Sequence, residues 1–294
     1  MIVNPASRGG RGAADWPAAA VALRSHFGPF EFRFTSGPGD ASRIAREEAL
    51  RGRTLVVAFG GDGTISETAH GILEAGQLGK PAELGILPHG TGGDLVRSLA
   101  LPTRAADAAR ALRRGRSVDI DVGRVVFADG GEKSFVNSAS FGLSAEVARR
   151  VGDDRARGYV AETLRAASSY HCPEVELRLD SGSRRRLRIT TVSLHNGRYF
   201  GGGMNMAPEA ELTDGLLDLV VVRKLSFTKL VRESPRLYLG AHLGLPEVEH
   251  GRVRSLDARA VDSAREVPVE IDGEAGGALP ARFEIRPRAI RLRV

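Results

Sequence analysis

Five consecutive residues, Gly60-Gly61-Asp62-Gly63-Thr64, combine a backbone that can approach a ligand closely with a carboxylate that can do chemistry. They follow an apolar run, Leu55–Phe59, which is typical of a buried strand in a parallel sheet. After them, apolar residues recur at helical spacing: Ile65, Ala69, Ile72 and Leu73. The motif is therefore predicted to form a strand-to-helix turn at the carboxyl end of a strand, where open α/β sheets bind ligands.

The residue types in this turn suit phosphate and its chemistry. Three glycines let the backbone approach a ligand with no Cβ in the way, and the following helix offers free N–H groups to phosphate oxygens. Asp62 lies among these donors, and a carboxylate is a poor neighbour for phosphate unless a cation or a hydroxyl engages it. We interpret the glycines as phosphate ligands and Asp62 as a group for chemistry or metal binding. A plain tight turn is the alternative.

A second glycine loop follows another strand in the same half of the chain. The strand Leu84–Pro88 opens into His89-Gly90-Thr91-Gly92-Gly93-Asp94, and near the start Ile2–Val3 opens into the loop Asn4–Gly12. Strands alternate with helices through residue 115, which predicts a parallel sheet with helices on both faces. Both glycine loops leave the carboxyl ends of strands, so they can line one crevice. Residues 1–116 are thus predicted to form an α/β domain.

Strands dominate the rest of the chain, and residues 117–285 are predicted to form a β-rich, sandwich-like second domain. Three elements are predicted from local pattern alone: a strand over Phe30–Thr35, a helix over Tyr159–Tyr170, and a helix over Ser226–Leu239 despite Pro235.

Composition and charge narrow the class of protein. The chain has 294 residues, 42% hydrophobic and 27% charged, which is ordinary for a soluble two-domain protein. No apolar run is long enough to span a bilayer, no signal peptide is recognised, and the single Cys172 excludes an intrachain disulfide, all of which suits the cytoplasm. The net charge of +6 favours anionic partners. Arg184-Arg185-Arg186 and Arg188 could attract anionic lipid headgroups or form a solvated hairpin edge.

Six stretches, in order, resemble the motifs of the diacylglycerol kinase catalytic-domain superfamily, which also holds sphingosine kinases, ceramide kinases and the bacterial YegS/DgkB-type lipid kinases. They are Asn4–Gly12, Gly60–Ile65, Pro88–Asp94, Asn196–Met204, Thr213–Asp218 and Ile271–Glu274. The match covers nearly the whole chain and is closest to the bacterial members that lack regulatory domains. A single Gly-Gly-Asp-Gly is weak support, because NAD kinases and phosphofructokinases have similar loops; six motifs in order are strong support.

The resemblance implies an α/β domain and a β-rich domain with ATP in the cleft between them, and a chain end, 286–294, that can rejoin the first domain. By similarity, the nucleotide contacts lie in loops at strand ends: Asn4, Thr35, Gly60, Gly61, Asp62, Gly63, Thr64, Ile65, Glu67, Gly90, Thr91 and Asp94. The residue types support these contacts, because hydroxyls and backbone N–H groups can donate hydrogen bonds to phosphate oxygens. Thr35 could equally cap the turn that follows it.

The resemblance also implies Mg²⁺. In the bacterial relatives a structural magnesium site uses an aspartate and two backbone carbonyls, which carries over to Asp214 with the carbonyls of Glu211 and Leu216. An Asp-Gly hairpin turn is the alternative for Asp214. Asp62 and Asp94 are candidate ligands of a second cation, the one that bridges the ATP phosphates.

By similarity the acceptor of the hydroxyl proton is Glu274, and Asp272 orients it or serves beside it. Asp62 is a rival, because the sphingosine-kinase branch gives the base role to this aspartate. An exposed hairpin followed by a surface glutamate is the alternative without chemistry.

Two positions depart from the family pattern: Gly93 stands where asparagine is usual, and Ser66 follows Ile65 where asparagine is frequent. Gly93 removes a polar side chain and opens the possibility of an impaired enzyme.

The sequence therefore predicts an ATP- and Mg²⁺-dependent kinase of a lipid alcohol, most simply a diacylglycerol-like one. An NAD kinase-like or other hydroxyl kinase, and a non-catalytic nucleotide- or lipid-binding regulator, are the alternatives. The expected partners are nucleotide and a lipid substrate at a membrane surface that the protein visits transiently; no nucleic acid is expected, and a homodimer is left open.

Overall fold

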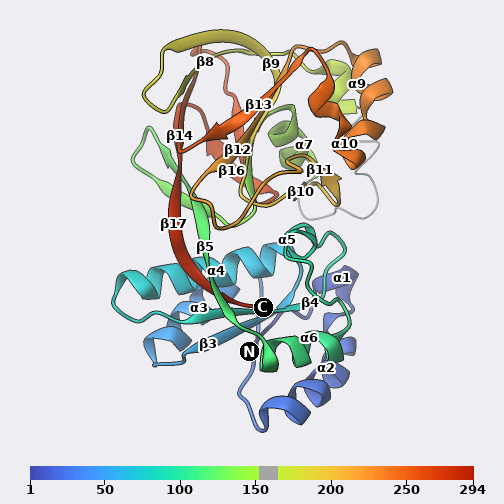
Figure 1. The fold of residues 1–294 in the computed structure, drawn as a ribbon, viewed down its shortest axis with the longest axis vertical. Helices are drawn as coiled ribbons and strands as arrows, with labels where there is room; N and C mark the ends of the chain where they lie inside the picture. The colour runs from blue at the N-terminus through green and yellow to red at the C-terminus, as the bar shows by residue number, and fades with distance from the viewer. Residues whose placement is uncertain (152–164) are drawn as a thin grey trace. The chain divides into compact units, whose positions relative to one another are not determined.

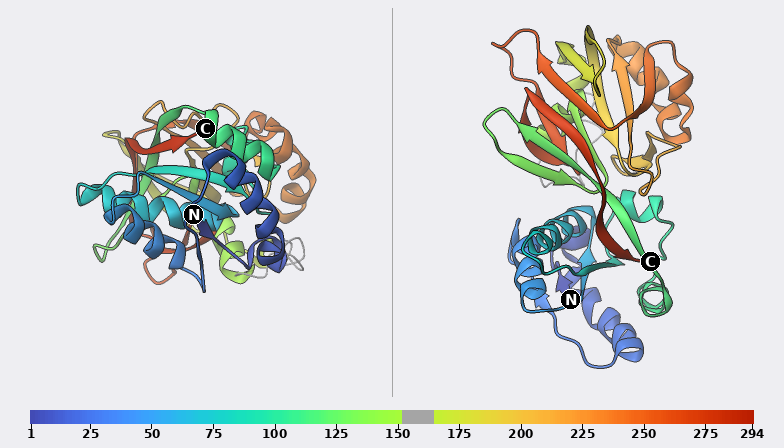
Figure 2. Two further views of the ribbon diagram at one scale, coloured as in Figure 1. Left: turned by 90° about the horizontal axis from the view of Figure 1, so that it is seen from below. Right: turned by 60° about the vertical axis from the view of Figure 1, so that its left-hand side comes forward.

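The structure is a computed structural model that describes residues 1–151 and 165–294 and divides into two compact units. Unit 1 comprises Met1–Asp121 with Arg288–Val294, and unit 2 comprises Val122–Pro287. The chain leaves unit 1 along β5 (Ser117–Phe127) and returns along β17 (Ala281–Arg293). These two strands pair with each other, as the right-hand view of Figure 2 shows.

Unit 1 alternates strands with helices. Its strands are β1 (Ile2–Val3), β2 (Arg33–Phe34), β3 (Leu55–Gly60), β4 (Glu83–Pro88) and the end of β17, and its helices are α1 (Ser7–Gly10), α2 (Gly12–Phe27), α3 (Asp40–Leu50), α4 (Asp62–Gln77), α5 (Asp94–Ser98) and α6 (Ala105–Arg114). Neighbouring strands pair in parallel in the order β2-β1-β3-β4-β17. The helices α3 and α4 cover one face, and α2 and α6 the other (Figure 1).

The alternation of side chains along β3 explains this double cover. Val57 and Phe59 point to one face, where they join Trp16 and Leu23 of α2 and Leu112 of α6 in one core cluster. Successive strand residues point to opposite faces, so the side chains of Val56 and Ala58 point towards the face that α3 and α4 cover. A strand that is apolar at every position, as this one is, can only be stable between two layers of helices.

Unit 2 is built mainly of antiparallel strands. They are the remainder of β5 and β17 with β6 (Glu132–Phe135), β7 (Ser138–Gly142), β8 (Glu174–Leu179), β9 (Arg184–His195), β10 (Tyr199–Phe200), β11 (Met204–Asn205), β12 (Leu217–Arg223), β13 (Val248–Val253), β14 (Ser255–Ala260), β15 (Pro268–Ile271) and β16 (Glu274–Ala278). The helical elements are α7 (Leu143–Val151), residues 165–169, α9 (Phe227–Glu233), α10 (Pro235–Leu239) and the 3₁₀ turn Ala241–Gly244.

The long strand β9 takes part in both layers of a sandwich. Its first half pairs with β8 in the layer β9-β8-β14-β17-β5-β6, and its second half pairs with β7 and β12 in the layer β16-β15-β7-β9-β12-β13. Between the layers lies one apolar core that includes Phe135, Phe141 and Phe283, all fully buried. Each such side chain contributes about 1.5–3 kcal/mol by leaving water.

The predicted fold class is confirmed, whereas two locally predicted elements are wrong in extent. The predicted strand Phe30–Thr35 is reduced to β2, two residues at the edge of the sheet, and Phe32 and Phe34 are partly exposed. The predicted helix Ser226–Leu239 is split into α9 and α10, because Pro235 begins a new helix rather than continuing the old one. The first part of the predicted helix Tyr159–Tyr170 lies outside the described residues.

Two glycines of α4 give a matched test of the packing. A Cβ on Gly71 would collide with the backbone carbonyl of Ser42 in α3, while a Cβ on Gly76 would meet nothing within 4 Å. We expect Gly71→Ala to lower the free energy of unfolding by about 1–3 kcal/mol through overpacking. Gly76→Ala should raise it by about 0.4–1 kcal/mol, because alanine loses less chain entropy on folding. Urea unfolding of both variants checks this, and equal effects would show that α3 and α4 are not in close contact.

Candidate active site

The two glycine loops meet backbone to backbone in unit 1. The N–H of His89 donates to the carbonyl of Gly60 over 2.8 Å, which continues the β3–β4 pairing past the strand ends. A Cβ on Gly90 would lie 2.6 Å from the Cα of Gly61, closer than side-chain atoms come. The second loop can therefore pass this close to the first only because residue 90 is glycine, and a Cβ on Gly61 would make a tight contact of 3.3 Å with the Cα of Gly90.

Asp62 lies where these loops cross, at the start of α4. Its Oδ2 accepts the backbone N–H of Gly93 at 2.7 Å. Its Oδ1 is buried and has no hydrogen-bond partner in the part of the chain that the structure describes. An unpaired buried oxygen costs about 1–3 kcal/mol, so a site that keeps one is suited to a ligand that supplies a cation or a proton.

Gly93 adopts a left-handed conformation with φ 67° and ψ 35°. Glycine has no steric penalty there, and asparagine is among the few other residues that visit this region routinely. The glycine here and the asparagine usual in the family can therefore adopt the same backbone. The N–H that reaches Asp62 belongs to the backbone, so it does not depend on the side chain at this position.

Asn4 and Thr64 fasten the first loop of the chain to the Gly60–Thr64 turn. The Asn4 Nδ2 donates to Thr64 Oγ1 over 2.9 Å, and Asn4 Oδ1 accepts the N–H of Ala6. Thr64 in turn fills the space that a side chain on Gly60 would need. The predicted ligand Asn4 is thus held in a fixed orientation beside the predicted phosphate loop.

His89, which is not among the predicted site residues, contacts three elements. Its Nδ1 lies 2.7 Å from the Ser7 hydroxyl, its Nε2 lies 3.1 Å from Asp15 Oδ2, and its ring stacks on Phe59 with centroids 4.6 Å apart. The hydrogen bond from His89 is the main cause that holds the pKa of the Asp15 carboxyl below its ordinary value. The Ser7 hydroxyl also donates to the carbonyl of Asn4 at 2.8 Å. His89 therefore ties the first loop and α2 to the start of the second glycine loop.

The other predicted nucleotide ligands of unit 1 differ in their burial and in their hydrogen-bond and ion-pair partners. Both carboxylate oxygens of Glu67 accept backbone N–H groups at the start of α3, from Gly39 and Ala41. Asp94 is buried at the start of α5, 3.3 Å from Arg97. Thr91 is exposed in its loop, Ile65 is buried in the core, and Thr35 follows directly on β2. The contacts of Glu67 thus make it a helix cap, a role that its sequence position did not reveal.

In unit 2 the predicted catalytic residues lie on the hairpin that joins β15 to β16. Asp272 has φ 48° and Gly273 has φ 87°, the two positive values of a type I′ turn. The Asp272 carboxylate accepts three backbone N–H groups at 2.9–3.0 Å, from Val136, Asn137 and Ser138. Asp272 therefore anchors the hairpin to the start of β7.

Glu274 is exposed at the first position of β16. A neighbouring carboxylate that was not predicted from the sequence, Glu270, is 1% exposed in β15. Glu270 accepts the N–H of Gly273 and the hydroxyl of Ser140. Two acidic side chains, Asp272 and Glu270, thus fix the hairpin that carries Glu274 by accepting hydrogen bonds.

A row of polar residues runs across the face of the second sheet layer that is turned away from the apolar core. Strand register aligns Glu270, Ser140 and Ser193 in one row and Ser138, His195 and Asp218 in the next. All are buried except Asp218, which is half-buried, and burial raises the pKa of the Asp218 carboxyl. Among the described residues, Ser138, Ser193 and His195 have no side-chain hydrogen-bond partner. We call these six residues the polar stripe.

The two carboxylate oxygens of Asp214, the predicted metal ligand, differ in their hydrogen bonding. Oδ1 accepts the N–H of Leu216 at 2.9 Å. Within residues 1–151 and 165–294, Oδ2 is buried without a hydrogen-bond partner, and the nearest cationic group, the Arg252 guanidinium, is 4.0 Å away. Such an oxygen fits a hard cation. No group of three or more His, Cys, Asp and Glu side chains in the described chain is arranged to hold a metal. A cation here would draw its other ligands from backbone carbonyls and water.

Comparisons with known proteins agree with this architecture. The family profile described as the diacylglycerol kinase catalytic domain matches residues 1–125, and that of the YegS C-terminal NAD kinase beta sandwich-like domain matches residues 137–294. A diacylglycerol kinase of Mycobacterium tuberculosis is 31% identical over 299 residues, covering 99% of this chain and 93% of the relative. A diacylglycerol kinase of Bacillus subtilis is 28% identical, covering 85% and 80%.

Solved structures share the fold. The crystal structure of a diacylglycerol kinase from Bacillus anthracis superimposes with a TM-score of 0.74 at 22% identity, covering 99% of this chain and 94% of that chain. At this identity the likeness shows the fold alone.

Together, these matches place the chain in a class of two-domain kinases, as the six ordered motifs predicted. The chain belongs to the diacylglycerol kinase catalytic-domain family, with the YegS-type C-terminal domain. Within the described residues, no helix has both the length and the apolar character that crossing a membrane requires.

The polar stripe generates a prediction about acid stability. Burial lowers the pKa of His195 to about 3, so the folded protein keeps this imidazole neutral. The unfolded chain takes up a proton below about pH 6.5, and stability is therefore lost as pH falls from 6.5 towards 3. Between pH 7 and 5.5 we expect His195→Phe to lose about 1 kcal/mol less unfolding free energy than the parent protein.

Urea unfolding at both pH values measures this difference. His171→Phe is the control, because His171 is exposed. Parallel pH profiles of the parent and His195→Phe would contradict a neutral buried imidazole.

Proposed function

We propose that this protein transfers the γ-phosphoryl group of ATP, in the presence of Mg²⁺, to the hydroxyl of a lipid alcohol such as diacylglycerol. The observation that carries the proposal is the buried, unpaired Oδ1 of Asp62 at the crossing of two glycine loops. A plain structural turn gives no reason to keep such an oxygen, whereas phosphoryl transfer needs an anionic group beside the phosphates to hold a cation or a proton. The activity named for the M. tuberculosis relative supports the choice of acceptor.

Unit 1 supplies groups suited to a nucleotide. Gly61 and Gly63 are half-buried glycines at the start of the 16-residue α4, whose first N–H groups and dipole favour phosphate, and Gly60 precedes them at the end of β3. Asn4 and Thr64 hold this turn in shape, and the exposed Thr91 offers a further hydroxyl. We assign Thr35 and Gly90 to the rim of the same site and give Glu67 a positioning role through α3.

A bound Mg²⁺ would spread the charge that develops on the transferred phosphoryl group. Asp62 is the stronger candidate to hold it, because Asp94 already lies beside Arg97. Asp214, with the carbonyls of Glu211 and Leu216, is our candidate for a second, structural cation.

Glu274 is our choice of proton acceptor. It is exposed at the first position of β16, on a hairpin that Asp272 anchors by accepting three backbone N–H groups. Asp272 is therefore a positioning residue that holds the hairpin. Asp62 is the rival base, since its open oxygen could accept a proton instead of binding a cation.

The first test combines a substrate panel with two isosteric variants. Purified protein, ATP and Mg²⁺ are mixed with micelles of diacylglycerol, sphingosine, ceramide or phosphatidylglycerol, and with NAD as a soluble acceptor. We expect a lipid to gain phosphate, most readily diacylglycerol. Glu274→Gln should reduce the rate by about 10²–10⁴-fold with nucleotide binding retained. Asp62→Asn should be at least as damaging because it weakens the proposed cation site.

Glu74→Gln is the matched control, an exposed glutamate further along α4 that pairs only loosely with Arg46, at 3.5 Å. A nearly silent Glu274→Gln beside an inactive, ATP-binding Asp62→Asn would move the base to Asp62. Phosphate on NAD alone, or on no acceptor, would refute the lipid kinase.

The second test concerns Asp214 and uses a closely matched control. Asp214 and Asp262 each accept the N–H of the residue two positions on, at 2.9 and 3.0 Å, but Asp262 is exposed and only Asp214 keeps a buried open oxygen. We expect MgCl2 to raise the melting temperature of the parent and of Asp262→Asn, and to have little effect on Asp214→Asn. Thermal unfolding without nucleotide measures this. Superimposable metal titrations of the parent and Asp214→Asn would show that no cation binds there.

A further inference from the structure

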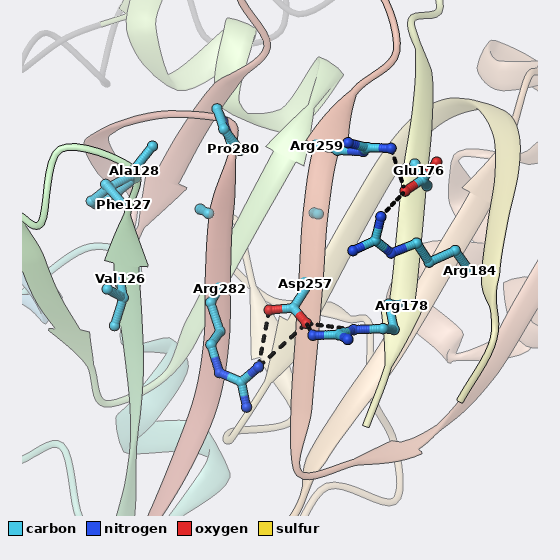
Figure 3. A pocket seen from close by; sticks show the side chains of 12 residues that line it. Val126, Phe127, Ala128, Glu176, Arg178, Arg184, Asp257, Arg259, Pro280 and Arg282 are labelled. Atoms are coloured by element: carbon cyan, nitrogen blue, oxygen red, sulfur yellow. Dashed lines mark hydrogen bonds and ion pairs between the residues drawn. The ribbon is translucent and has the colours of Figure 1, made fainter. Parts of the chain in front are cut away.

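The outer face of the first sheet layer of unit 2 carries a groove of about 390 Å³ lined by arginines. Figure 3 shows Arg178, Arg184, Arg259 and Arg282 around Glu176 and Asp257, with an apolar wall of Val126, Phe127, Ala128 and Pro280. We call this the arginine groove. None of the proposed catalytic residues lines it.

Strand register arranges its charges in rows. Across β17, β14, β8 and β9, one row reads Arg282, Asp257, Arg178 and Arg184. The adjoining row reads Arg259, Glu176 and Arg186. Both rows therefore have an arginine at each end and a single carboxylate within.

The carboxylates are shared, and positive charge is left over. Asp257 accepts from Arg178 at 2.9 Å and from Arg282 at 3.0 Å. Glu176 lies 2.8 Å from Arg259, 3.4 Å from Arg184 and 3.3 Å from Arg186. Glu284, which also contacts Arg282, is shared with Arg124. Two carboxylates thus serve five arginines in these rows.

The positions of these charges favour an external anion. The Glu176 side chain is 8% exposed, whereas those of Arg184 and Arg259 are 58% and 52% exposed, so these two guanidinium groups form part of the rim and the Glu176 carboxylate lies on the floor. Arg178 and Arg184 lie directly opposite each other in the β8–β9 register. Like charges in that position repel, and an anion between them would remove the repulsion. Guanidinium groups present paired N–H donors that match phosphate geometry.

The apolar wall narrows the class of anion. Phe127 and Pro280 line the same groove as the arginines, so a ligand would present an anionic group and an apolar group side by side. The volume lies in the range of small-molecule sites. It suits the phosphate, glycerol and first methylenes of a phospholipid, with the acyl chains left in the bilayer.

We propose that the arginine groove binds the phosphate of an anionic phospholipid headgroup and so holds the protein on anionic membrane surfaces. The proposal goes beyond phosphoryl transfer and does not depend on it, because binding requires neither ATP nor a phosphorylated product. It assigns to Arg178 and Arg184 a role that ion pairing alone does not give them.

Vesicle flotation without nucleotide tests the site. Vesicles of phosphatidylcholine are compared with mixed phosphatidylcholine–phosphatidylglycerol vesicles. Arg184→Gln leaves Glu176 with Arg259 and Arg186, so no carboxylate is orphaned. We expect it to weaken partition onto the mixed vesicles about fivefold, and the double variant Arg178→Gln/Arg184→Gln about 25-fold. Added salt should weaken binding of the parent protein, and phosphatidylcholine alone should bind poorly.

Arg223→Gln is the matched control. Arg223 lies on β12, is 50% exposed, and leaves Glu249 paired with Arg185 when it is removed. It should retain parental partition; an equal loss in this variant would show diffuse attraction and refute a defined groove. Parental partition of the double variant would also refute the site.

Soluble competitors separate the sources of phosphate. Glycerol phosphate at the concentration of the accessible lipid should not displace the protein from vesicles, because it lacks the apolar part and the surface. Displacement by it, or by a short single-stranded oligonucleotide, would overturn the lipid assignment in favour of a soluble anion or a nucleic acid. Failure of the kinase assay would leave these results unaffected.

Discussion

The parallel pairing of β3 with β4 is the constraint on which the candidate site depends. The pairing runs from Leu55 opposite Glu83 to Gly60 opposite Pro88, and one further hydrogen bond joins His89 to Gly60. The two loops leave adjacent strands and pass each other at Gly61 and Gly90, where a Cβ on Gly90 would collide with the backbone of Gly61. The glycines are therefore a packing requirement as well as a means of exposing N–H groups. The same crossing brings the N–H of Gly93 to Asp62 and leaves the other oxygen of that carboxylate open.

In unit 2 the long strand β9 separates apolar from polar side chains. Alternate residues of β9, such as Val192 and Leu194, enter the apolar core, while Ser193 and His195 face the other way into the polar stripe. A register shift of one residue would exchange the two sets and bury the polar groups in the core. The hairpin that carries Glu274 is fixed to this sheet by hydrogen bonds that the carboxylates of Asp272 and Glu270 accept, as well as by the apolar packing of Val269 and Ile271 of β15.

Much of the architecture could be predicted because it depends on patterns of residue types that lie close together in the sequence. The all-apolar run before Gly60 and the glycines after it predict a buried strand and a ligand-binding turn, and both are present. Side-chain partners were harder to predict. Nothing near Glu67 indicates that Gly39 and Ala41 lie against it, and nothing near Asp272 points to the backbone of residues 136–138. His89 and Glu270 were missed for the same reason, because their partners Ser7, Asp15 and Ser140 are remote in sequence. The one available signal was the position of His89 at the head of a glycine loop.

The last strand of unit 1 has a consequence for how the protein is made. Arg291–Arg293 of β17 pair in parallel with Glu83–Gly85 of β4, and the N–H of Val294 donates a hydrogen bond to the carbonyl of Arg116. During synthesis from the N-terminus, residues 1–121 emerge long before residues 288–294. Until then β4 is an edge strand with unpaired backbone groups, a position that invites pairing with other chains. The parallel sheet of unit 1 can therefore be completed only after the intervening unit has left the ribosome, so its folding depends on the timing of translation.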